Sequence, residues 1–254
     1  MEKILEVNDL TKIFSRRGQP DIIAVDHISF DLDKGGCLGI IGESGSGKST
    51  AAHMITRLTY ASGGEIILDG ENITRAEGRS LRKAYRRMQM VFQTPAASFD
   101  PRRTLGDGIG ESLENTGMSR RSVRDRVSEL LFKCGLSADF AGLYPHQVSA
   151  GQCQRAAIAR ALAVEPLLLI CDEATSSLDM TVQKEIMALF NMLRQLYGRR
   201  LSFLFISHDI ALVQQFCSDL IVMHKGRIVE RGAASDVIRD PVSPHTRRLI
   251  DSIL

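Results

Sequence analysis

The sequence lacks any apolar run near the ~20 residues that a helix needs to cross a bilayer. Its first ten residues are acidic and interrupted, unlike a secretory signal. A net charge of only +2 argues against nucleic acid or an anionic membrane surface as a partner. The five cysteines form no CxxC pair, which is typical of free thiols in a reducing compartment. We expect a soluble protein, with any membrane span supplied by other subunits.

The 254 residues, 44% hydrophobic and 24% charged, suit one large globular domain or one domain with an inserted lobe. Continuous apolar runs at residues 38–41, 167–171 and 201–206 are typical of buried parallel strands. Residues 3–33 read as short strands. Helical spacing dominates from about 96 to 160, which predicts a helical lobe inserted into an α/β core.

A glycine-rich segment carries the clearest chemistry. Residues 42–50 read Gly-Glu-Ser-Gly-Ser-Gly-Lys-Ser-Thr, between a predicted strand at 38–41 and a predicted helix at 50–58. Glycines let the backbone N–H groups turn toward phosphates, and the following helix N-terminus adds partial positive charge. Lys48 can reach the β- and γ-phosphates of a nucleotide, and Ser49 can ligate Mg²⁺. The predicted nucleotide-binding residues here are Gly42, Ser44, Gly45, Ser46, Gly47, Lys48, Ser49 and Thr50.

Two carboxylates follow the apolar run at 167–171, at the strand end where α/β sheets bind ligands. We expect Asp172 to hold Mg²⁺ and Glu173 to act as the general base for the attacking water. Alone, such a run could be any buried strand that meets a helix cap. Downstream of a complete phosphate loop, it predicts nucleotide hydrolysis. Kinases, GTPases, helicases and transporters all use such loops, so the biological task stays open at this point.

Residues 148–155, Val-Ser-Ala-Gly-Gln-Cys-Gln-Arg, resemble the LSGGQxQR signature of the ABC ATPase family. The resemblance runs along the whole chain in the family's order. It implies a P-loop NTPase core with a mostly parallel sheet, an N-terminal antiparallel β subdomain and an inserted helical lobe. One ABC ATPase domain would span 1–254, with its core at about 1–95 and 161–238. The helical subdomain would cover about 96–160, and a short tail about 239–254.

The resemblance assigns further roles. Gln93 falls at the family's Q-loop, where it would assist Mg²⁺ and catalysis, and residues 177–179 look like its D-loop, ending in Asp179. His208 looks like the switch histidine. Phe14 falls where the family stacks an aromatic ring on adenine, although Ile13 or Val25 could also touch the base. Each of these residues has a plainer alternative. Gln93 could be a surface glutamine, His208 a histidine at a strand end, and Phe14 a core residue.

The resemblance also implies a head-to-tail dimer with two ATP molecules between the subunits. Ser149, Gly151 and Gln152 of one subunit would face the γ-phosphate on the other's loop, because a helix start offers free N–H groups. Glu173 would drive hydrolysis, with His208 and Lys48 stabilising the developing charge. Ala150 replaces the family's first signature glycine, and alanine narrows backbone freedom. The alanine therefore predicts that this chain offers a weaker signature site to the partner's nucleotide, and that it works in an asymmetric heterodimer, although a homodimer is also possible.

Residues 93–102 resemble the FQxPxxSxxPR segment of the oligopeptide, dipeptide and nickel importer ATPases, and residues 240–250 resemble their HPYTRxL ending, broken here by Val-Ser-Pro-His. An amphipathic helix with a proline start is the plainer interpretation of that tail. The resemblance implies ATP and Mg²⁺ as cofactors, and permease subunits, a second ATPase subunit and an external solute-binding protein as partners. The location would be the cytoplasmic face of the inner membrane. Phe99, Leu105 and Ile109 could contact a membrane subunit or form the lobe's core.

Other readings are an exporter ATPase, another importer subfamily, a soluble ABC ATPase acting on DNA or ribosomes, a catalytically dead subunit, and a kinase. The third usually needs tandem cassettes, coiled-coil insertions or a basic linker, and none is present. Intact Lys48, Asp172, Glu173 and His208 oppose a dead subunit, and the signature opposes a kinase. The importer-like segments disfavour an exporter without excluding it.

Overall fold

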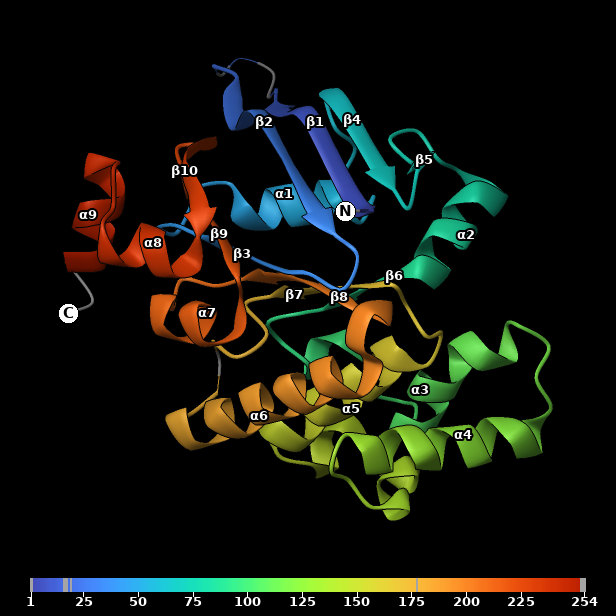
Figure 1. Ribbon diagram of the computed structural model, residues 1–254. Helices are drawn as coiled ribbons and strands as arrows, with labels where there is room; N and C mark the ends of the chain where they lie inside the picture. The colour runs from blue at the N-terminus through green and yellow to red at the C-terminus, as the bar shows by residue number, and fades with distance from the viewer. Residues whose placement is uncertain (1, 16–17, 19, 177, 252–254) are drawn as a thin grey trace.

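A computed structural model describes residues 2–15, 18, 20–176 and 178–251 of the chain. Two sheets organise it (Figure 1). The first is antiparallel, in the order β2-β1-β4-β5, with bounds β1 Lys3–Phe14, β2 Ile22–Asp33, β4 Gly63–Leu68 and β5 Glu71–Asn72. Alternate residues of β2 are buried from Ile28 onward, as a strand with one covered face requires.

The second sheet has the order β10-β9-β3-β8-β7-β6, and only β10 runs antiparallel to its neighbour. Its strands are β3 Cys37–Ile41, β6 Met88–Val91, β7 Leu168–Asp172, β8 Ser202–Ile206, β9 Asp219–His224 and β10 Arg227–Ala233. Every residue of β3, β7 and β8 is buried, which confirms that the three apolar runs form parallel strands covered on both faces.

Helices cover both faces of this sheet (Figure 1). Helix α1 Lys48–Ile55 lies between the two sheets, while α3 Leu105–Glu114, α4 Arg120–Lys133, α5 Ala150–Leu162 and α6 Met180–Tyr197 lie on the opposite side. One apolar core, which includes Ile4 and Ile206, joins the antiparallel sheet and α1 to the six strands. A second core, which includes Leu130 and Phe205, joins the other face to the helices.

The remaining helices are short. They are α2 Gly78–Arg87, α7 Ile210–Phe216, α8 Ala234–Arg239 and α9 Pro244–Asp251, with 3-10 turns at Ala96–Ser98, Ala138–Gly142, Pro145–Gln147 and Gly198–Arg200. Among the residues that the structure describes, no helix is long and apolar enough to span a membrane.

Several local predictions need correction. The helix expected at 50–58 begins at Lys48 and ends at Ile55, and the short strands expected in 3–33 are two strands of 12 residues. Helix α2 and strand β6 were not predicted. The helix expected near the end of the chain is α9, which begins earlier, at Pro244. The division of the chain into core, lobe and tail at the boundaries given above stays a prediction.

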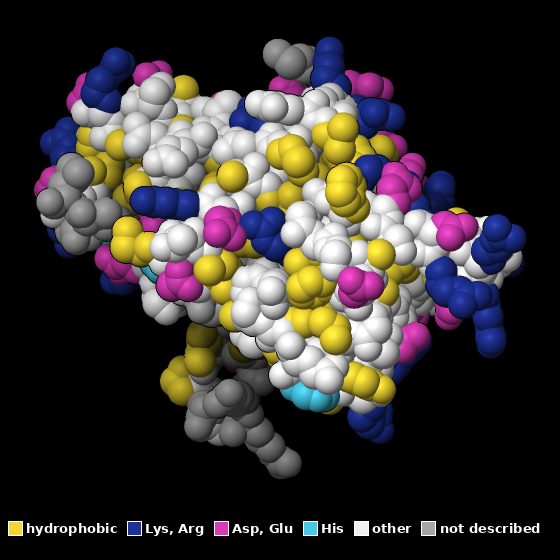
Figure 2. All heavy atoms as spheres, turned by 90° about the horizontal axis from the view of Figure 1, so that it is seen from below, with side chains coloured by type: hydrophobic (Ala, Val, Ile, Leu, Met, Phe, Trp, Pro, Cys, Tyr) yellow, Lys and Arg dark blue, Asp and Glu magenta, His cyan; other side chains and the backbone are white. Residues whose placement is uncertain are grey.

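The structure also decides between the two readings of three lobe residues. Phe99, Leu105 and Ile109 are all buried in the second core, so they are core residues and not an exposed docking surface. Figure 2 shows the face below the sheet, where hydrophobic side chains lie among charged ones and Lys and Arg side chains project at several edges. The exposed apolar side chains of α4 and α6 include Phe132, Met192 and Leu196.

Candidate nucleotide site

The glycine-rich loop connects the end of β3 to the start of α1. Gly42 and Gly47 have φ values of 153° and 103°. A Cβ at Gly42 would collide with the backbone oxygen of Met223, and one at Gly47 with that of Ala24. Because both positions combine positive φ with close backbone approach, only glycine fits them. The strand, loop and helix that a phosphate loop requires are thus present.

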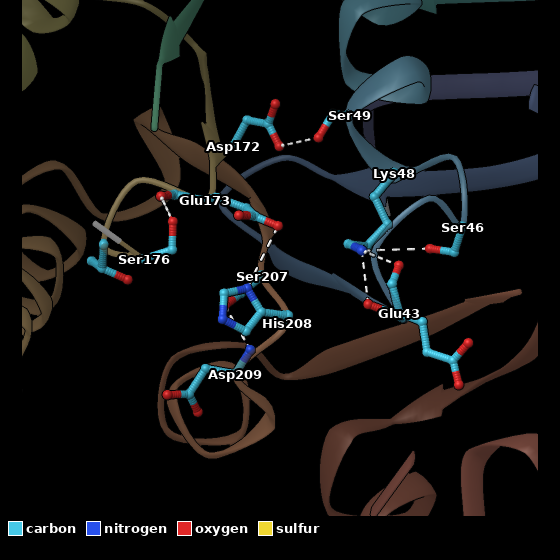
Figure 3. A network of polar contacts seen from close by, with 12 residues as sticks. Glu43, Ser46, Lys48, Ser49, Asp172, Glu173, Ser176, Ser207, His208 and Asp209 are labelled. Carbon is cyan, nitrogen blue, oxygen red and sulfur yellow. Dashed lines mark hydrogen bonds and ion pairs between the residues drawn. The ribbon is translucent and has the colours of Figure 1, made fainter. Parts of the chain in front are cut away.

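Lys48 lies inside this loop, and its side chain is buried, with a relative exposure of 4% for the residue. Its Nζ donates to the backbone oxygens of Gly42 at 2.7 Å and Glu43 at 2.9 Å, and lies 3.4 Å from Ser46 Oγ (Figure 3). Burial lowers the pKa of Lys48 from its usual value, and the nearby carboxylates of Glu173 and Asp172 oppose that shift. The loop therefore holds a buried cationic donor.

Ser49 and Asp172 meet across the gap between α1 and β7. Ser49 Oγ donates to Asp172 Oδ1 at 3.0 Å (Figure 3). Asp172 is only 7% exposed, and burial raises the pKa of its carboxyl. His53, one helical turn after Ser49, places its Nε2 3.9 Å from Asp172 Oδ2. The sequence interpretation missed His53, although its spacing from Ser49 puts both on one face of α1.

Glu173 follows β7, and His208 follows the neighbouring strand β8. Because these strands are parallel, with Asp172 opposite Ile206, their ends reach the same edge. Glu173 Oε1 lies 3.5 Å from His208 Nδ1 (Figure 3). The backbone N–H of Glu173 donates to the backbone oxygen of Ile206 at 2.9 Å. Glu173 has a φ of 48°, an uncommon conformation for a residue other than glycine. Such outliers cluster at functional sites.

Two further predicted residues lie on the surface. Gln93 is exposed two residues after the end of β6, which pairs in parallel with β7, so it lies toward the same edge as Asp172. Phe14, the last residue of β1, is 42% exposed, with Lys12 Nζ 4.8 Å from its ring centroid. Val25 is fully buried and belongs to the core. Phe14 therefore has the exposure that a stacking platform needs, and Val25 does not.

The signature segment begins α5. Ser149 Oγ accepts from the Gln152 N–H at 3.2 Å, and Gln152 Oε1 accepts from the Ser149 N–H at 2.9 Å, a reciprocal helix cap. Ala150 is exposed at the first helical residue. Gly151 is buried, and a Cβ there would lie 2.5 Å from Cγ1 of Val182 on α6. The polar contacts that the structure describes for Ser149 stay within α5 and do not reach residues 42–50.

The predicted D-loop is described only in part, because Ser177 lies outside the described residues. Asp179 caps α6: its Oδ1 accepts from the N–H groups of Thr181 and Val182, both at 3.0 Å. Leu178 packs against the second core. Asp179 therefore acts as the N-cap that starts α6, and its role toward nucleotide stays a prediction.

A phosphate loop with a buried lysine, beside two carboxylates at the end of β7 and a histidine after the adjacent parallel strand β8, defines a nucleotide-hydrolysing α/β protein. The family model described as "ABC transporter" matches residues 25–176, and the chain belongs to this family. The predicted resemblance is thereby confirmed.

Two curated relatives and one solved structure show how far the likeness extends. The Oligopeptide transport ATP-binding protein OppF of Bacillus subtilis (strain 168) is 41% identical, over 99% of this chain and 83% of its own length. The Di/tripeptide transport ATP-binding protein DppF of Pseudomonas aeruginosa (strain UCBPP-PA14) is 38% identical, over 99% and 79%. A dimeric ATP-binding cassette in a post-hydrolysis state, bound to ADP and Pi, superposes with a TM-score of 0.82 at 28% identity, covering 91% of this chain and 98% of its own.

These likenesses confirm the predicted fold class and the predicted activity. The chain is an ATP-binding cassette that binds and hydrolyses ATP.

Proposed function

We propose that this chain is the ATPase subunit of an ABC importer of peptides. The observation that carries the proposal is the convergence of Lys48, the Ser49–Asp172 pair and the Glu173–His208 pair on one sheet edge. The names of OppF and DppF, which refer to oligopeptide and di/tripeptide transport, support the cargo class. Nickel or a related small solute is the alternative cargo. An exporter or another importer subfamily is the alternative assignment.

The roles at the site follow from its chemistry. Backbone N–H groups of residues 42–50 and the Lys48 ammonium bind the phosphates of ATP, and Phe14 stacks on adenine. Ser49 and Asp172 fit Mg²⁺, because a hydroxyl and a carboxylate only 3.0 Å apart present the oxygen ligands that this ion prefers, and Gln93 adds a third. Bound Mg²⁺ neutralises phosphate charge. Glu173 accepts the proton of the attacking water, and His208 orients that carboxylate and stabilises the γ-phosphate.

The second half of the site comes from another chain. The start of α5, where Ser149 is exposed, Gln152 is half-buried and Gly151 is buried, faces the γ-phosphate held by the partner's loop, and Asp179 lies in the same contact. The dimeric solved cassette supports this arrangement. The partner is a different ATPase subunit, because Ala150 stands where the family has a glycine. Ala150 is exposed at the first helical residue, so alanine is accommodated within this chain, and the weakening falls on the contact with the nucleotide of the partner.

In this assembly the chain docks on permease subunits at the cytoplasmic face of the inner membrane. An external solute-binding protein delivers the cargo. The lobe at about 96–160 contacts the permease, and the core at about 1–95 and 161–238 holds the nucleotide. The names of the relatives as transport proteins support these partners.

Replacing the proposed base tests the function directly. In Glu173→Gln the side chain keeps its shape but cannot accept the proton, so we expect ATP hydrolysis to fall by about 10²–10⁴. ATP binding should persist, and size-exclusion chromatography should show an ATP-dependent dimer. Glu114→Gln, an exposed site on α3, is the matched control and should turn over normally. Unchanged turnover in Glu173→Gln would remove this residue from the role of base.

The partner and the cargo need a separate experiment. ATP hydrolysis is measured for the purified chain alone and after co-expression with the ATPase and permeases encoded beside it. We expect weak turnover alone and a marked rise in the complex, stimulated by peptide-loaded binding protein and not by a nickel-loaded one. Strong cooperative turnover by the chain alone would contradict the need for a different ATPase.

A further inference from the structure

Three potential ligand side chains, distant in sequence, meet beside the phosphate loop. They are Glu43 in the loop, His224 at the end of β9, and His245 in the first turn of α9, and one ligand atom of each lies within 4.8 Å of the others. His245 Nε2 lies 3.7 Å from Glu43 Oε1, and the two imidazole centroids are 3.3 Å apart. The Glu43 carboxylate points away from Lys48 (Figure 3), so this cluster is separate from the nucleotide site's own contacts.

The fold holds each member in place. Glu230 on β10 accepts hydrogen bonds from the backbone N–H groups of Val242 at 2.8 Å and Ser243 at 3.0 Å, which fixes the start of α9. Ile250 of the same helix is buried in the second core. His224 belongs to a strand of the central sheet, and the Glu43 backbone is bound by Lys48. The convergence is therefore built from anchored elements and does not depend on long, mobile side chains alone.

The chemistry of the cluster suits a metal ion. His245 Nε2 is buried and makes no hydrogen bond within the described part of the chain, so it is an unsatisfied buried polar atom. Glu43 is exposed, which leaves an entry path.

We propose that Glu43, His224 and His245 bind one first-row transition-metal dication of the zinc class. Two imidazoles and a carboxylate, with a water in the fourth position, are a known ligand set for Zn²⁺. Bonds of ~2.0–2.1 Å in a tetrahedron separate neighbouring ligand atoms by about 3.4 Å, close to the 3.7 Å between His245 and Glu43. The two imidazole rings, whose centroids are 3.3 Å apart, turn away from each other on binding, because imidazoles that share one ion have centroids about 5 Å apart. The bound ion joins α9 to the phosphate loop, so its release changes how firmly the loop's second residue is held.

Two positively charged side chains near the cluster, Arg248 and Lys225, repel a metal cation and have to move aside when it binds. Arg248 Nη2 lies 3.0 Å from His245 Nδ1, and coordination through Nε2 requires the proton on Nδ1. The Arg248 side chain is exposed and can therefore turn into solvent, as can that of Lys225. Removing this competition with Arg248→Gln should tighten metal binding.

The test is calorimetric titration of the full, nucleotide-free chain with Zn²⁺, with Mg²⁺ as the control ion. We expect one Zn²⁺ per chain and no comparable binding of Mg²⁺. His224→Gln, His245→Gln and Glu43→Gln should each weaken binding by more than about 100-fold, since outer-shell partners alone are worth 10–100-fold. His146→Gln, an exposed histidine far from the cluster in sequence, should bind as the parent chain does.

A second readout uses Co²⁺, whose visible absorption intensifies in a tetrahedral protein site. We expect this absorption in the parent chain and its loss in Glu43→Gln, whose exposed side chain can change without unfolding the core. No saturable Zn²⁺ binding, or binding unchanged in the three cluster variants, would overturn the proposal. Because nucleotide is absent from both measurements, either failure leaves the proposed function untouched.

Discussion

At the scale of single residues, Lys48, the Ser49–Asp172 pair and the Glu173–His208 pair take their positions from contacts between separate elements. The spacing in residues 42–50 and the pair after residue 171 indicated Lys48, Ser49, Asp172 and Glu173, because phosphate binding and water activation need those groups in that order. The sequence could not show that Lys48 binds its own loop's carbonyls or that Glu173 takes a positive φ. Both depend on close packing against other strands.

The cluster of Glu43, His224 and His245 is a second case of contacts between distant segments that the sequence does not reveal. Its members are separated by up to about 200 positions, and the sequence around each gives no metal-binding spacing. Only the order of strands β9 and β3, and the return of α9 toward the loop, brings them together.

The buried carboxylate of Asp172 leads to a prediction with a defined sign. Burial raises its pKa in the folded chain above the unfolded value, so ionisation opposes folding at neutral pH. This opposition fades as pH falls through the raised folded pKa, and it is gone below the unfolded pKa, where both the folded and the unfolded chain are protonated. We expect Asp172→Asn to raise the thermal unfolding midpoint of the nucleotide-free chain at neutral pH, with a gap that narrows on acidification.

Melting curves over a pH series measure this effect, with Asp125→Asn on α4 as the matched exposed control. Asp172→Asn should also gain less stability from Mg²⁺ and ATP than the parent chain, because it lacks the negative charge that attracts the ion. A gap that widens toward acidic pH would contradict the role assigned to burial.

At the scale of elements, long apolar runs were easy to predict and interrupted ones were not. Strand β1 looked like short pieces because register shifts at residues 7–10 break its alternation, and Asp9 there has a φ of 53°. Helix α2 escaped prediction because its apolar stripe is short: Leu81, Ala84 and Tyr85 share one face, and only Ala84 is fully buried. Propensity alone is a weak guide to such exposed helices.

The start of α5 allows three neighbouring residues to be compared. Ser149→Ala removes a reciprocal cap and should cost about 1 kcal/mol of unfolding free energy. Gly151→Ala places a methyl against the stiff side chain of Val182 and should cost about 1–3 kcal/mol. Ala150→Gly, at an exposed site, should cost under about 1 kcal/mol.

Urea unfolding midpoints of the three variants check this order. If Gly151→Ala were no less stable than Ala150→Gly, α5 and α6 would not pack as closely as the structure indicates. The same series tests the two glycine positions of the signature separately. Position 151 requires glycine because it packs against α6, whereas position 150 tolerates alanine.

At the scale of the whole molecule, the layers followed from the sequence because buried parallel strands and an amphipathic helical region leave few arrangements. The two apolar cores on either side of the six-stranded sheet carry the strand ends of β3, β7 and β8 to one edge, where the groups proposed to be catalytic meet. A single chain, however, places the start of α5 out of polar contact with its own phosphate loop. Completion of the site therefore has to be tested between chains.

Mixing two defective chains provides that test. Both chains carry Glu173→Gln, and in addition one carries Lys48→Ala and the other Ser149→Arg. Because Glu173→Gln prevents hydrolysis, bound ATP holds copies of this chain together even where turnover needs a different partner. Each variant alone builds only damaged sites, because every site in a head-to-tail dimer uses one loop and the opposite α5. In the mixed dimer one site combines the intact Lys48 of the second chain with the intact Ser149 of the first. We expect neither variant alone to retain ATP and the mixture to retain one ATP per mixed dimer, measured by filter retention of labelled nucleotide. If both motifs acted within one chain, every site in the mixture would still lack a residue and no ATP would be held.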